Sequence, residues 1–260
     1  MLIATHLLVL LVLAAFVAGW VDAVVGGGGL IQLPALLIGL PSDTPVATIA
    51  GTNKVPAAAG TLMATATYLR NVRVDWRSAL PLMATAWLGS TAGANLAHHM
   101  PREWFTPLVL VVILVVGGYT VRRPQLGLQQ KLRHDGRSHL GRLLGIGGGV
   151  GLYDGLVGPG TGTFFVIALV SVMGYGFLEA SALTKLANLT TNLAAISVFV
   201  LHGSILWRVA LCMAVANLTG GLLGARTAVR RGNAFVRKVF LVVIFALAVK
   251  LAWDTLQLVL

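Results

Sequence analysis

Two lysines lie inside otherwise apolar stretches of the chain, and their neighbours could help to bind an anion. Lys54 directly follows Thr52 and Asn53, and Lys185 precedes Asn188 by about one helical turn. An ammonium group is costly in the core of a membrane and usually faces a partner or a water-filled cavity there. The alternative is that each long side chain extends to the membrane surface. Because both lysines have amide and hydroxyl neighbours, the sequence favours an anion-binding role.

Two glycine-rich stretches offer a second set of groups for the same chemistry. Asp22 is followed by Gly26–Gly29, and Asp154 is followed by Gly158–Gly162, which includes a proline. Glycine and proline disfavour a continuous helix. In a bilayer, backbone groups freed in this way are tolerated only where protein buries them or water reaches them. We therefore predict two broken helices whose backbone N–H groups could hold a small oxyanion.

Further polar side chains follow Lys185 at helical spacing. Asn188 and Asn192 lie one turn apart and share a helix face, and Thr191 lies beside them. Side chains of this kind commonly form hydrogen bonds between membrane helices, so both packing and substrate contact stay open for them. The predicted substrate-binding residues are Gly26, Gly27, Gly28, Gly29, Thr52, Asn53, Lys54, Gly158, Gly160, Thr161, Lys185, Asn188 and Asn192.

The two aspartates before the glycine runs have three candidate roles. Asp22 and Asp154 could carry protons, could form ion pairs with the lysines, or could cap the helices that begin after the glycines, since a carboxylate is stabilised at a helix N-terminus. Gln32, just beyond the first glycine run, is a weaker candidate of the same kind. The sequence leaves these roles open.

The composition indicates an integral membrane protein. Of the 260 residues, 57% are hydrophobic and only 10% are charged, whereas soluble domains carry about 25% charged residues. The net charge of +11 comes from short clusters between apolar segments, which argues against nucleic-acid binding. The sequence shows no nucleophile with a neighbouring base, no Walker loop and no metal-ligand motif, and its single cysteine is Cys212. We therefore expect neither an enzyme nor a cofactor nor a metal.

Ten apolar segments can be drawn, and the charges lie between them. Three connections, at 70–77, 122–142 and 226–238, hold 14 of the 19 Lys and Arg residues. All three fall on the same side when the segments are counted as spans, and the positive-inside rule makes that side cytoplasmic. The opposite connections contain only Arg102 and Arg208. The predicted segments are 3–21, 29–40, 46–69, 79–98, 104–121, 142–157, 161–174, 180–201, 208–226 and 235–257.

The chain contains an internal repeat. A shift of 131 residues places Lys54 on Lys185, and a shift of 132 places Asp22 on Asp154. Each half has five segments, an odd number, so the second copy would enter the membrane from the opposite side, as in many secondary transporters. We predict an all-α protein with a first repeat at 1–125, a basic cytoplasmic linker at 126–141 and a second repeat at 142–260.

Two of the ten segments, 29–40 and 161–174, are short for a crossing that needs about 20 residues. We favour re-entrant hairpins, in which each short segment turns back on its predecessor at the glycine run. Such hairpins would enter from opposite faces and bring both glycine runs toward the membrane centre. Full crossings by tilted or unwound helices are the alternative.

Four stretches resemble the sulfite exporter TauE/SafE family, also called the toluene sulfonate uptake permease family. They are Asp22–Pro34, Gly51–Gly60, Asp154–Thr163 and Leu183–Asn192, and the letters GGGGLI and GTNK within them are fairly specific. The resemblance covers nearly the whole chain. It implies a secondary transporter of sulfur-containing anions, such as sulfite, sulfonates or related organic acids, in a bacterial inner membrane. The second half has LTKL in place of GTNK and GPGTG in place of GGGG, so the resemblance supports Lys54 more strongly than Lys185.

Together these features predict a multi-pass transporter that moves a small anionic solute by alternating access, with Asp22 and Asp154 as the candidates for proton coupling. The alternatives are a passive anion channel of the same fold and a membrane accessory protein with no solute of its own. Membrane lipids are expected partners, and a homo-oligomer is compatible with the sequence. The identity of the anion, the direction of transport and the coupling ion are left open.

Overall fold

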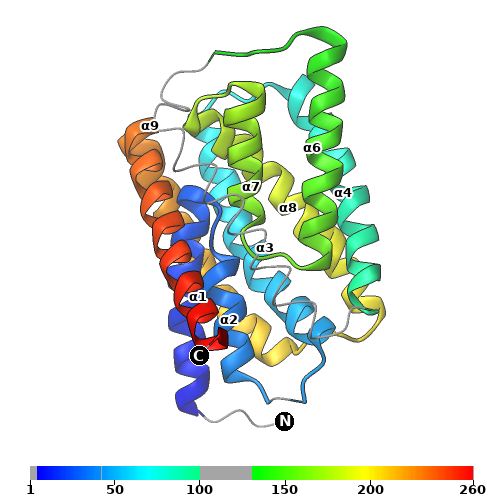
Figure 1. Cartoon of the computed structure of the whole chain (residues 1–260), viewed down its shortest axis with the longest axis vertical. Coiled ribbons are helices and arrows are strands. Elements are labelled where there is room, and N and C mark those ends of the chain that lie inside the picture. Colours follow the sequence, from blue (N-terminus) through cyan, green and yellow to red (C-terminus); the bar gives the residue numbers. More distant parts are fainter. Residues whose placement is uncertain (1–4, 42, 100–130, 260) are drawn as a thin grey trace.

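The protein is a bundle of helices (Figure 1). A computed structural model describes residues 5–41, 43–99 and 131–259, and these ranges contain helices and no strands. The predicted segment at 104–121 lies outside the described residues, as do Arg102, Arg122 and Arg123. The helices are α1 (Thr5–Val25), α2 (Gly29–Gly39), α3 (Val46–Asn71), α4 (Trp76–Ala97), α6 (Gly136–Leu156), α7 (Thr161–Ala168), the π-helix η1 (Leu169–Met173), α8 (Phe177–Leu201) and α9 (Trp207–Val259).

Helices are present at every predicted segment that the structure describes, although two boundaries differ. α6 begins at Gly136, so the end of the predicted basic linker forms its first turns. The label α9 covers two helices, because the helical backbone breaks at Gly232, with φ of 69° and ψ of −168°, between the two predicted segments at 208–226 and 235–257, and the chain turns back there (Figure 1). The predicted connection is therefore present but short, since arginine is a strong helix former and the helices on both sides extend over its arginines.

Three described helical stretches are long and apolar enough to span a membrane: His6–Val25, Phe177–Leu201 and Trp207–Val243. Two shorter apolar helical stretches, Gly29–Gly39 and Thr161–Met173, contain too few residues for a crossing. They follow the two glycine runs, as the hairpin prediction requires.

The two short helices turn back along their predecessors, as predicted for re-entrant hairpins. α2 returns beside the first turns of α1, and Gly39 packs against the side chain of Leu11. α7 and η1 return along α6, and the amide of Lys131 donates a hydrogen bond of 2.8 Å to the carbonyl of Gly174. In Figure 1 the open end of the α1–α2 hairpin lies at the bottom and that of the α6–α7 hairpin at the top. The hairpins therefore enter the bundle from opposite ends.

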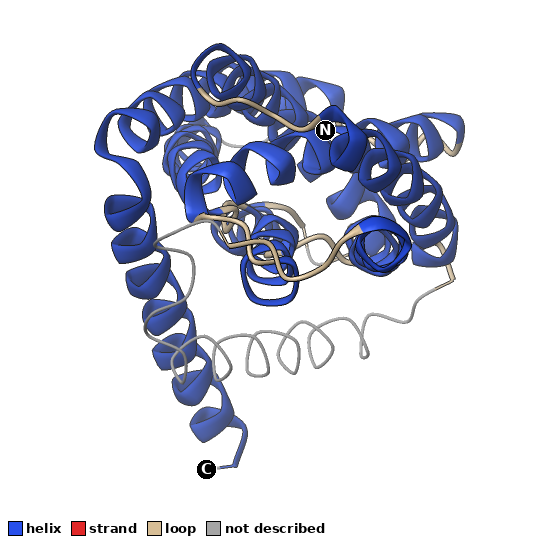
Figure 2. Cartoon of the chain, turned by 90° about the horizontal axis from the view of Figure 1, so that it is seen from above, coloured by secondary structure: helices blue, strands red, loops and turns tan. Residues whose placement is uncertain are grey.

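The most extensive helix contacts join α1 to α9 and α4 to α6. Glycines permit both: a Cβ atom on Gly220 would clash with the carbonyl of Phe16, and one on Gly89 would clash with that of Gly148. A shift of 131 relates the two glycines, and a shift of 132 relates Phe16 to Gly148. These contacts are the ones that two related halves would make. Beyond Gly232, α9 runs along the edge of the bundle to the C-terminus (Figure 2).

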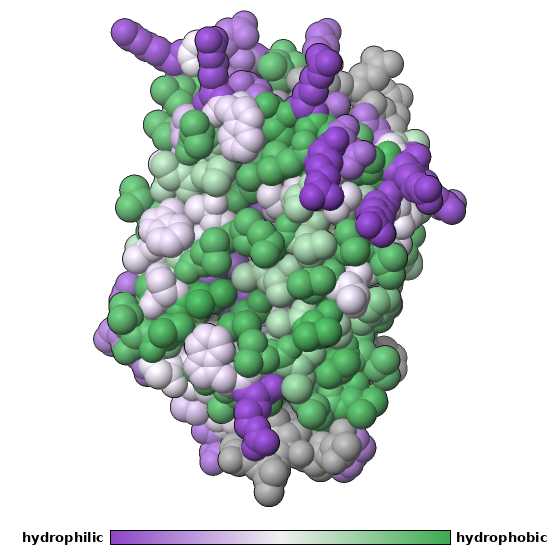
Figure 3. Space-filling view, turned by 180° about the vertical axis from the view of Figure 1, so that it is seen from behind, coloured by the Kyte–Doolittle hydropathy of each residue, from purple (hydrophilic) through white to green (hydrophobic). Residues whose placement is uncertain are grey.

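The described parts of the three basic connections lie at one end of the bundle, the top in Figure 1. Figure 3 shows long hydrophilic side chains gathered toward this end, above a broad hydrophobic surface. The positive-inside rule assigns it to the cytoplasm. Here Ser78 donates to Asp75, at 2.7 Å, and accepts a hydrogen bond from Tyr175, at 3.0 Å. Burial raises the pKa of the Tyr175 hydroxyl, which favours its protonated, donating form.

Candidate functional site

The two helix breaks are built on glycines with left-handed backbone. Gly26 has φ of 86° and Gly158 has φ of 89°, and these two residues occupy equivalent positions at a shift of 132. Gly160, with φ of 80°, precedes the first residue of α7. Residues with a side chain rarely adopt this conformation. The glycine runs therefore end α1 and α6 where a continuous helix would otherwise cross the bundle.

The two breaks lie together inside the bundle and contact each other. A Cβ atom on Gly26 would clash with the backbone of Gly162, and the amide of Thr163 donates to the carbonyl of Gly26 at 3.1 Å. Gly29 packs on the backbone of Pro159. The amides of Gly27 and Gly28 lie between helices and have no hydrogen-bond acceptor within the described part of the chain.

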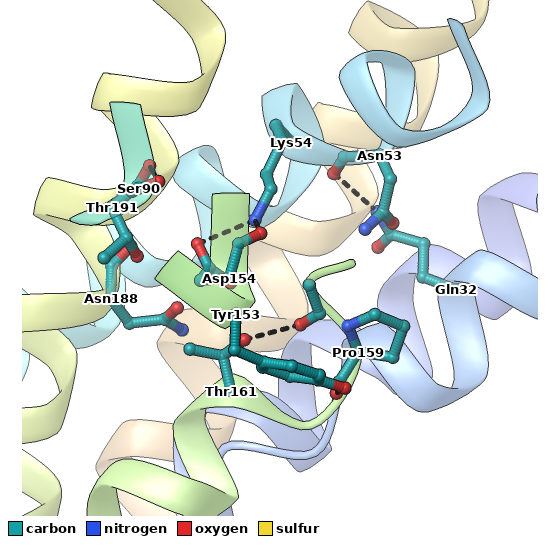
Figure 4. Close-up of polar contacts among 11 residues, drawn as sticks. Gln32, Asn53, Lys54, Ser90, Tyr153, Asp154, Pro159, Thr161, Asn188 and Thr191 are labelled. Carbon is teal, nitrogen blue, oxygen red and sulfur yellow. Dashed lines mark hydrogen bonds and ion pairs between the residues drawn. The ribbon is translucent and has the colours of Figure 1, made fainter. Parts of the chain in front are cut away.

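Each intramembrane lysine pairs with the aspartate of the other break. The ammonium of Lys54, on α3, lies 2.7 Å from both the Oδ2 atom and the carbonyl oxygen of Asp154, on α6 (Figure 4). The ammonium of Lys185, on α8, lies 2.9 Å from the Oδ2 atom of Asp22, on α1, and also donates to its carbonyl. The two pairs have the same geometry and are related by the repeat shift.

These pairs decide between several of the predicted roles. The side chains of Lys54 and Lys185 are only 3% and 0% exposed, so the interpretation that they extend to the membrane surface is wrong. The residues that precede α2 and α7, Gly28 and Gly160, receive no side-chain cap, so the capping role of the aspartates is also wrong. The aspartates are the ion-pair partners of the lysines.

Electrostatics explains why each lysine contacts both a carboxylate and a carbonyl. Asp22 and Asp154 lie near the C-terminal ends of α1 and α6, where unpaired carbonyls carry partial negative charge. A carboxylate alone is unfavourable at that end of a helix. An ammonium group offsets both charges, and the pair leaves the buried region close to neutral. Removing either member of an ion pair would leave the other charge buried without a partner.

The two carboxylates differ in exposure. The side chain of Asp154 is 2% exposed, whereas that of Asp22 is 17% exposed and lies 3.5 Å from the hydroxyl of Thr61. Asp22 is thus the more exposed carboxylate of the related pair in this conformation.

Thr52 and Asn53, predicted to contact substrate, have partners within the protein. The hydroxyl of Thr52 accepts a hydrogen bond of 3.0 Å from the amide of Leu206, which precedes α9. Gln32 donates to the side-chain oxygen of Asn53 at 2.8 Å, and Asn217 donates to Gln32 at 2.6 Å. This buried chain of amides connects α2, α3 and α9 beside Lys54.

Some polar residues of α8 contact a neighbouring helix, and others face the region of the helix breaks. Ser90, on α4, donates to the carbonyl of Thr191 at 2.7 Å, which is a helix–helix hydrogen bond. Figure 4 shows the amide of Asn188 directed toward the loop that carries Thr161. The side-chain nitrogen of Asn192 is buried and has no hydrogen-bond partner among the described residues. Asn188 and Asn192 thus retain polar groups that could face a solute.

The loop between α6 and α7 is held by two hydrogen bonds. The hydroxyl of Thr161 donates to the carbonyl of Gly158 at 2.7 Å, and that of Tyr153 donates to the carbonyl of Pro159 at 2.6 Å. Gly158 also lies against Lys54, because a Cβ atom on it would be 3.1 Å from the ammonium nitrogen. The loop therefore positions the second glycine run directly beside the first ion pair.

Comparison with known proteins identifies the family. The family model of the sulfite exporter TauE/SafE matches residues 11–251. The chain belongs to the TauE/SafE family. A probable membrane transporter protein of Sinorhizobium, ORF9, is 35% identical over 97% of this chain and 95% of its own length. A probable membrane transporter protein of Haemophilus influenzae is also 35% identical, over 97% of both chains, and Escherichia coli K12 YfcA is 30% identical over 98% of this chain and 93% of its own. No solved structure matches the TauE/SafE chain.

The family membership establishes the class of protein. This TauE/SafE protein is a multi-pass membrane transporter of the bacterial inner membrane and not an enzyme. Its resemblance to the family, first apparent in the glycine runs and the GTNK stretch, is confirmed along nearly the whole chain.

Sequence reasoning missed two residues that the TauE/SafE fold brings to the site. Asn217 was overlooked because its repeat equivalent is the apolar Ala86, and Tyr153 because its equivalent is Val21. Both lie inside apolar segments and could have been found by asking which polar groups there need a partner, since buried polar groups are nearly always hydrogen-bonded.

Replacing Gln32 with leucine is expected to destabilise this TauE/SafE protein. The change leaves the amides of Asn53 and Asn217 buried without their shared partner, at a cost of about 1–3 kcal/mol for each group. A thermal unfolding midpoint in detergent measures the effect. The matched control is Asn95→Ala, which removes an exposed amide bonded only to the carbonyl of Thr91 in the same helix, and should change stability by no more than about 0.5 kcal/mol. Equal midpoints for the two variants would contradict a structural role for the amide chain.

Proposed function

We propose that this protein is a secondary transporter that moves a small sulfur-containing anion, such as sulfite, a sulfonate or a related organic anion, across the inner membrane by alternating access. The observation that carries the proposal is the pair of equivalent ion pairs at the two helix breaks, Lys54 with Asp154 and Lys185 with Asp22. Each pair joins the two halves of the chain, so a change at either pair alters the contact between them.

The chemistry of these breaks suits an oxyanion. Each ammonium already holds a carboxylate, a group similar in charge and hydrogen bonding to a sulfite or sulfonate. The amides of Gly27 and Gly28, which have no acceptor among the described residues, supply neutral donors at the contact between the breaks. We propose that the solute replaces Asp154 or Asp22 as the partner of the lysine, with Asn188 and Asn192 on the opposite wall.

Charge balance favours a proton as the coupling ion. An anion added beside an intact Lys54–Asp154 pair would leave one negative charge in excess within a buried site, which is costly. If Asp154 accepts a proton as the anion binds to Lys54, the site keeps its net charge. Asp22, which is 17% exposed, is the carboxylate that could exchange a proton in this conformation. Transport of a fixed anion species that is indifferent to an imposed pH gradient would end this part of the proposal.

Alternating access is proposed to arise from two inverted halves, residues 1–125 and 142–260. The opposed hairpins and the matching glycine contacts of α1 with α9 and of α4 with α6 support this relation. The unequal exposure of Asp22 and Asp154 is what a conformation open toward one pair would produce. In the opposite conformation the exposures would be exchanged.

Counterflow into proteoliposomes tests the proposed function. Sulfite, thiosulfate, sulfoacetate, taurine and a carboxylate are compared for wild type, Lys54→Ala and Lys131→Ala. Saturable exchange of one anion should be lost in Lys54→Ala, because the ammonium of Lys54 is the group proposed to bind the anion. Exchange should be kept in Lys131→Ala, which removes an exposed lysine at the cytoplasmic end. The control separates the loss of a site from the loss of one positive charge.

The other outcomes distinguish the alternatives. Flux that never saturates and shows no counterflow would identify a passive channel of the same fold. No flux of any anion with well-folded wild-type protein would favour an accessory protein without a solute. Exchange that survives in Lys54→Ala would support a carrier but would show that Lys54 is not part of its binding site.

A further inference from the structure

A second group of basic side chains lies far from the ion pairs, at the cytoplasmic end of α3 and of the part of α9 that precedes Gly232. They line a cavity of about 550 Å³ with an open mouth. Three of its residues are arginines: Arg70 in the last turn of α3, and Arg226 and Arg230, one helical turn apart on α9. The remaining lining residues are Met63, Ala66, Thr67, Asn71, Leu222 and Val229.

The cavity lacks a compensating negative charge. None of its lining residues is acidic, and no ion pair of these arginines is found among the described residues. Like charges one turn apart on a helix, as for Arg226 and Arg230, are destabilising. An anion that bridges the arginines would offset this repulsion. Guanidinium groups bind phosphate and other oxyanions through paired N–H donors.

The walls of the cavity indicate which kind of anion fits. Thr67 and Asn71 add polar groups near the arginines, while Met63, Leu222 and Val229 make the rest apolar. Leucines on the same two helices, Leu62, Leu69 and Leu223, are exposed on the outer surface, where the acyl chains of the membrane would lie. A soluble anion would need a polar entrance through which it could reach the arginines from water. A ligand with a charged head and apolar chains matches both the basic cavity and the apolar outer surface beside it.

We propose that this cavity is a binding site for an anionic phospholipid of the cytoplasmic leaflet. Its phosphate would contact Arg70, Arg226 and Arg230, and its acyl chains would lie along the apolar surface of α3 and α9. Basic pockets between membrane helices on the cytoplasmic side are suited to lipid head groups of this kind. Because the site joins α3, which carries Lys54, to α9, the lipid would brace the two helices at their cytoplasmic ends.

Native mass spectrometry of the purified protein tests the site. Phosphatidylglycerol is titrated against phosphatidylcholine for wild type, Arg226→Gln/Arg230→Gln and Arg231→Gln/Arg237→Gln. The last variant removes the same charge from α9, on the two sides of Gly232 and outside the cavity, where Arg231 packs on the ring of Phe235. Wild type should prefer phosphatidylglycerol. The cavity variant should bind it about 25-fold more weakly, at roughly fivefold for each arginine, and the control should bind it as wild type does.

Other results would overturn the proposal. Equal weakening in the control variant would reduce the effect to general charge attraction. Equal binding of the two lipids by wild type would show that the cavity does not select an anionic phospholipid. Competition by inorganic sulfate or glycerol phosphate, without lipid selectivity, would make the cavity a site for soluble oxyanions instead. Should the double variant not purify as a monodisperse protein, Arg70→Gln on α3 serves in its place with an expected loss of about fivefold.

Discussion

Replacing Lys54 with methionine is expected to lower the free energy of unfolding by about 3–5 kcal/mol, because Asp154 is left buried without its counter-charge. Adding Asp154→Leu to the same chain should restore most of that loss, since the buried charge is then removed altogether. A small deficit should remain, because the carbonyl of Asp154 also loses its donor. Thermal unfolding midpoints of the two single variants and the double variant give the measurement.

The comparison separates stability from function. Transport should be absent in all three variants, because each lacks a group of the proposed site, even though the double variant is nearly as stable as wild type. Lys131→Met, at an exposed lysine, should leave both properties unchanged. If the double variant were as unstable as Lys54→Met, the unpaired charge of Asp154 would not be the cause of the lost stability. The packing contacts of the aliphatic part of the Lys54 side chain would then have to explain it.

The helices could be predicted because charges and glycines interrupt the apolar segments. The hairpins followed from the same signals, since α2 and α7 are too short to cross and each follows a glycine run. The break within α9 followed from the charges between two apolar segments, but its length could not be predicted from hydropathy alone. The arginines of this connection favour helix, so the helices on both sides extend up to Gly232, where the chain turns.

The pairing at the site was only partly accessible from the sequence. The repeat relates Lys54 to Lys185 and Asp22 to Asp154, but it does not tell whether a lysine pairs within its own half or across to the other. That choice depends on the packing of Gly26 on Gly162, which brings the ends of α1 and α6 together. Such a contact between backbones leaves no pattern in side-chain chemistry. The chain of amides that ends at Asn217 has the same origin, because it exists only once α2, α3 and α9 are in place.

Replacing Gly26 with alanine is expected to prevent assembly of the two halves. Its left-handed conformation, with φ of 86°, costs an alanine about 1–2 kcal/mol. The added methyl group also clashes with the backbone of Gly162, and overpacking of this kind typically adds about 1–3 kcal/mol. A backbone cannot rotate away as a side chain can, so the breaks must separate and both ion pairs must stretch. The yield of monodisperse protein after size exclusion, together with its unfolding midpoint, measures the effect.

Two other glycines separate the causes of this effect. Gly145, an exposed position within α6, has no atom within 4 Å of an added Cβ, so Gly145→Ala should be neutral or stabilise the protein by about 0.5–1 kcal/mol. Gly158→Ala shares the positive φ of 89°, but its nearest neighbour is the end of the Lys54 side chain, the ammonium nitrogen at 3.1 Å, and not a backbone atom. It should therefore fold better than Gly26→Ala and yet lose transport, because the methyl group displaces the lysine from Asp154. Equal stability of Gly26→Ala and Gly145→Ala would show that the two breaks do not need to touch, and the coupling between halves would then have to rest on the ion pairs alone.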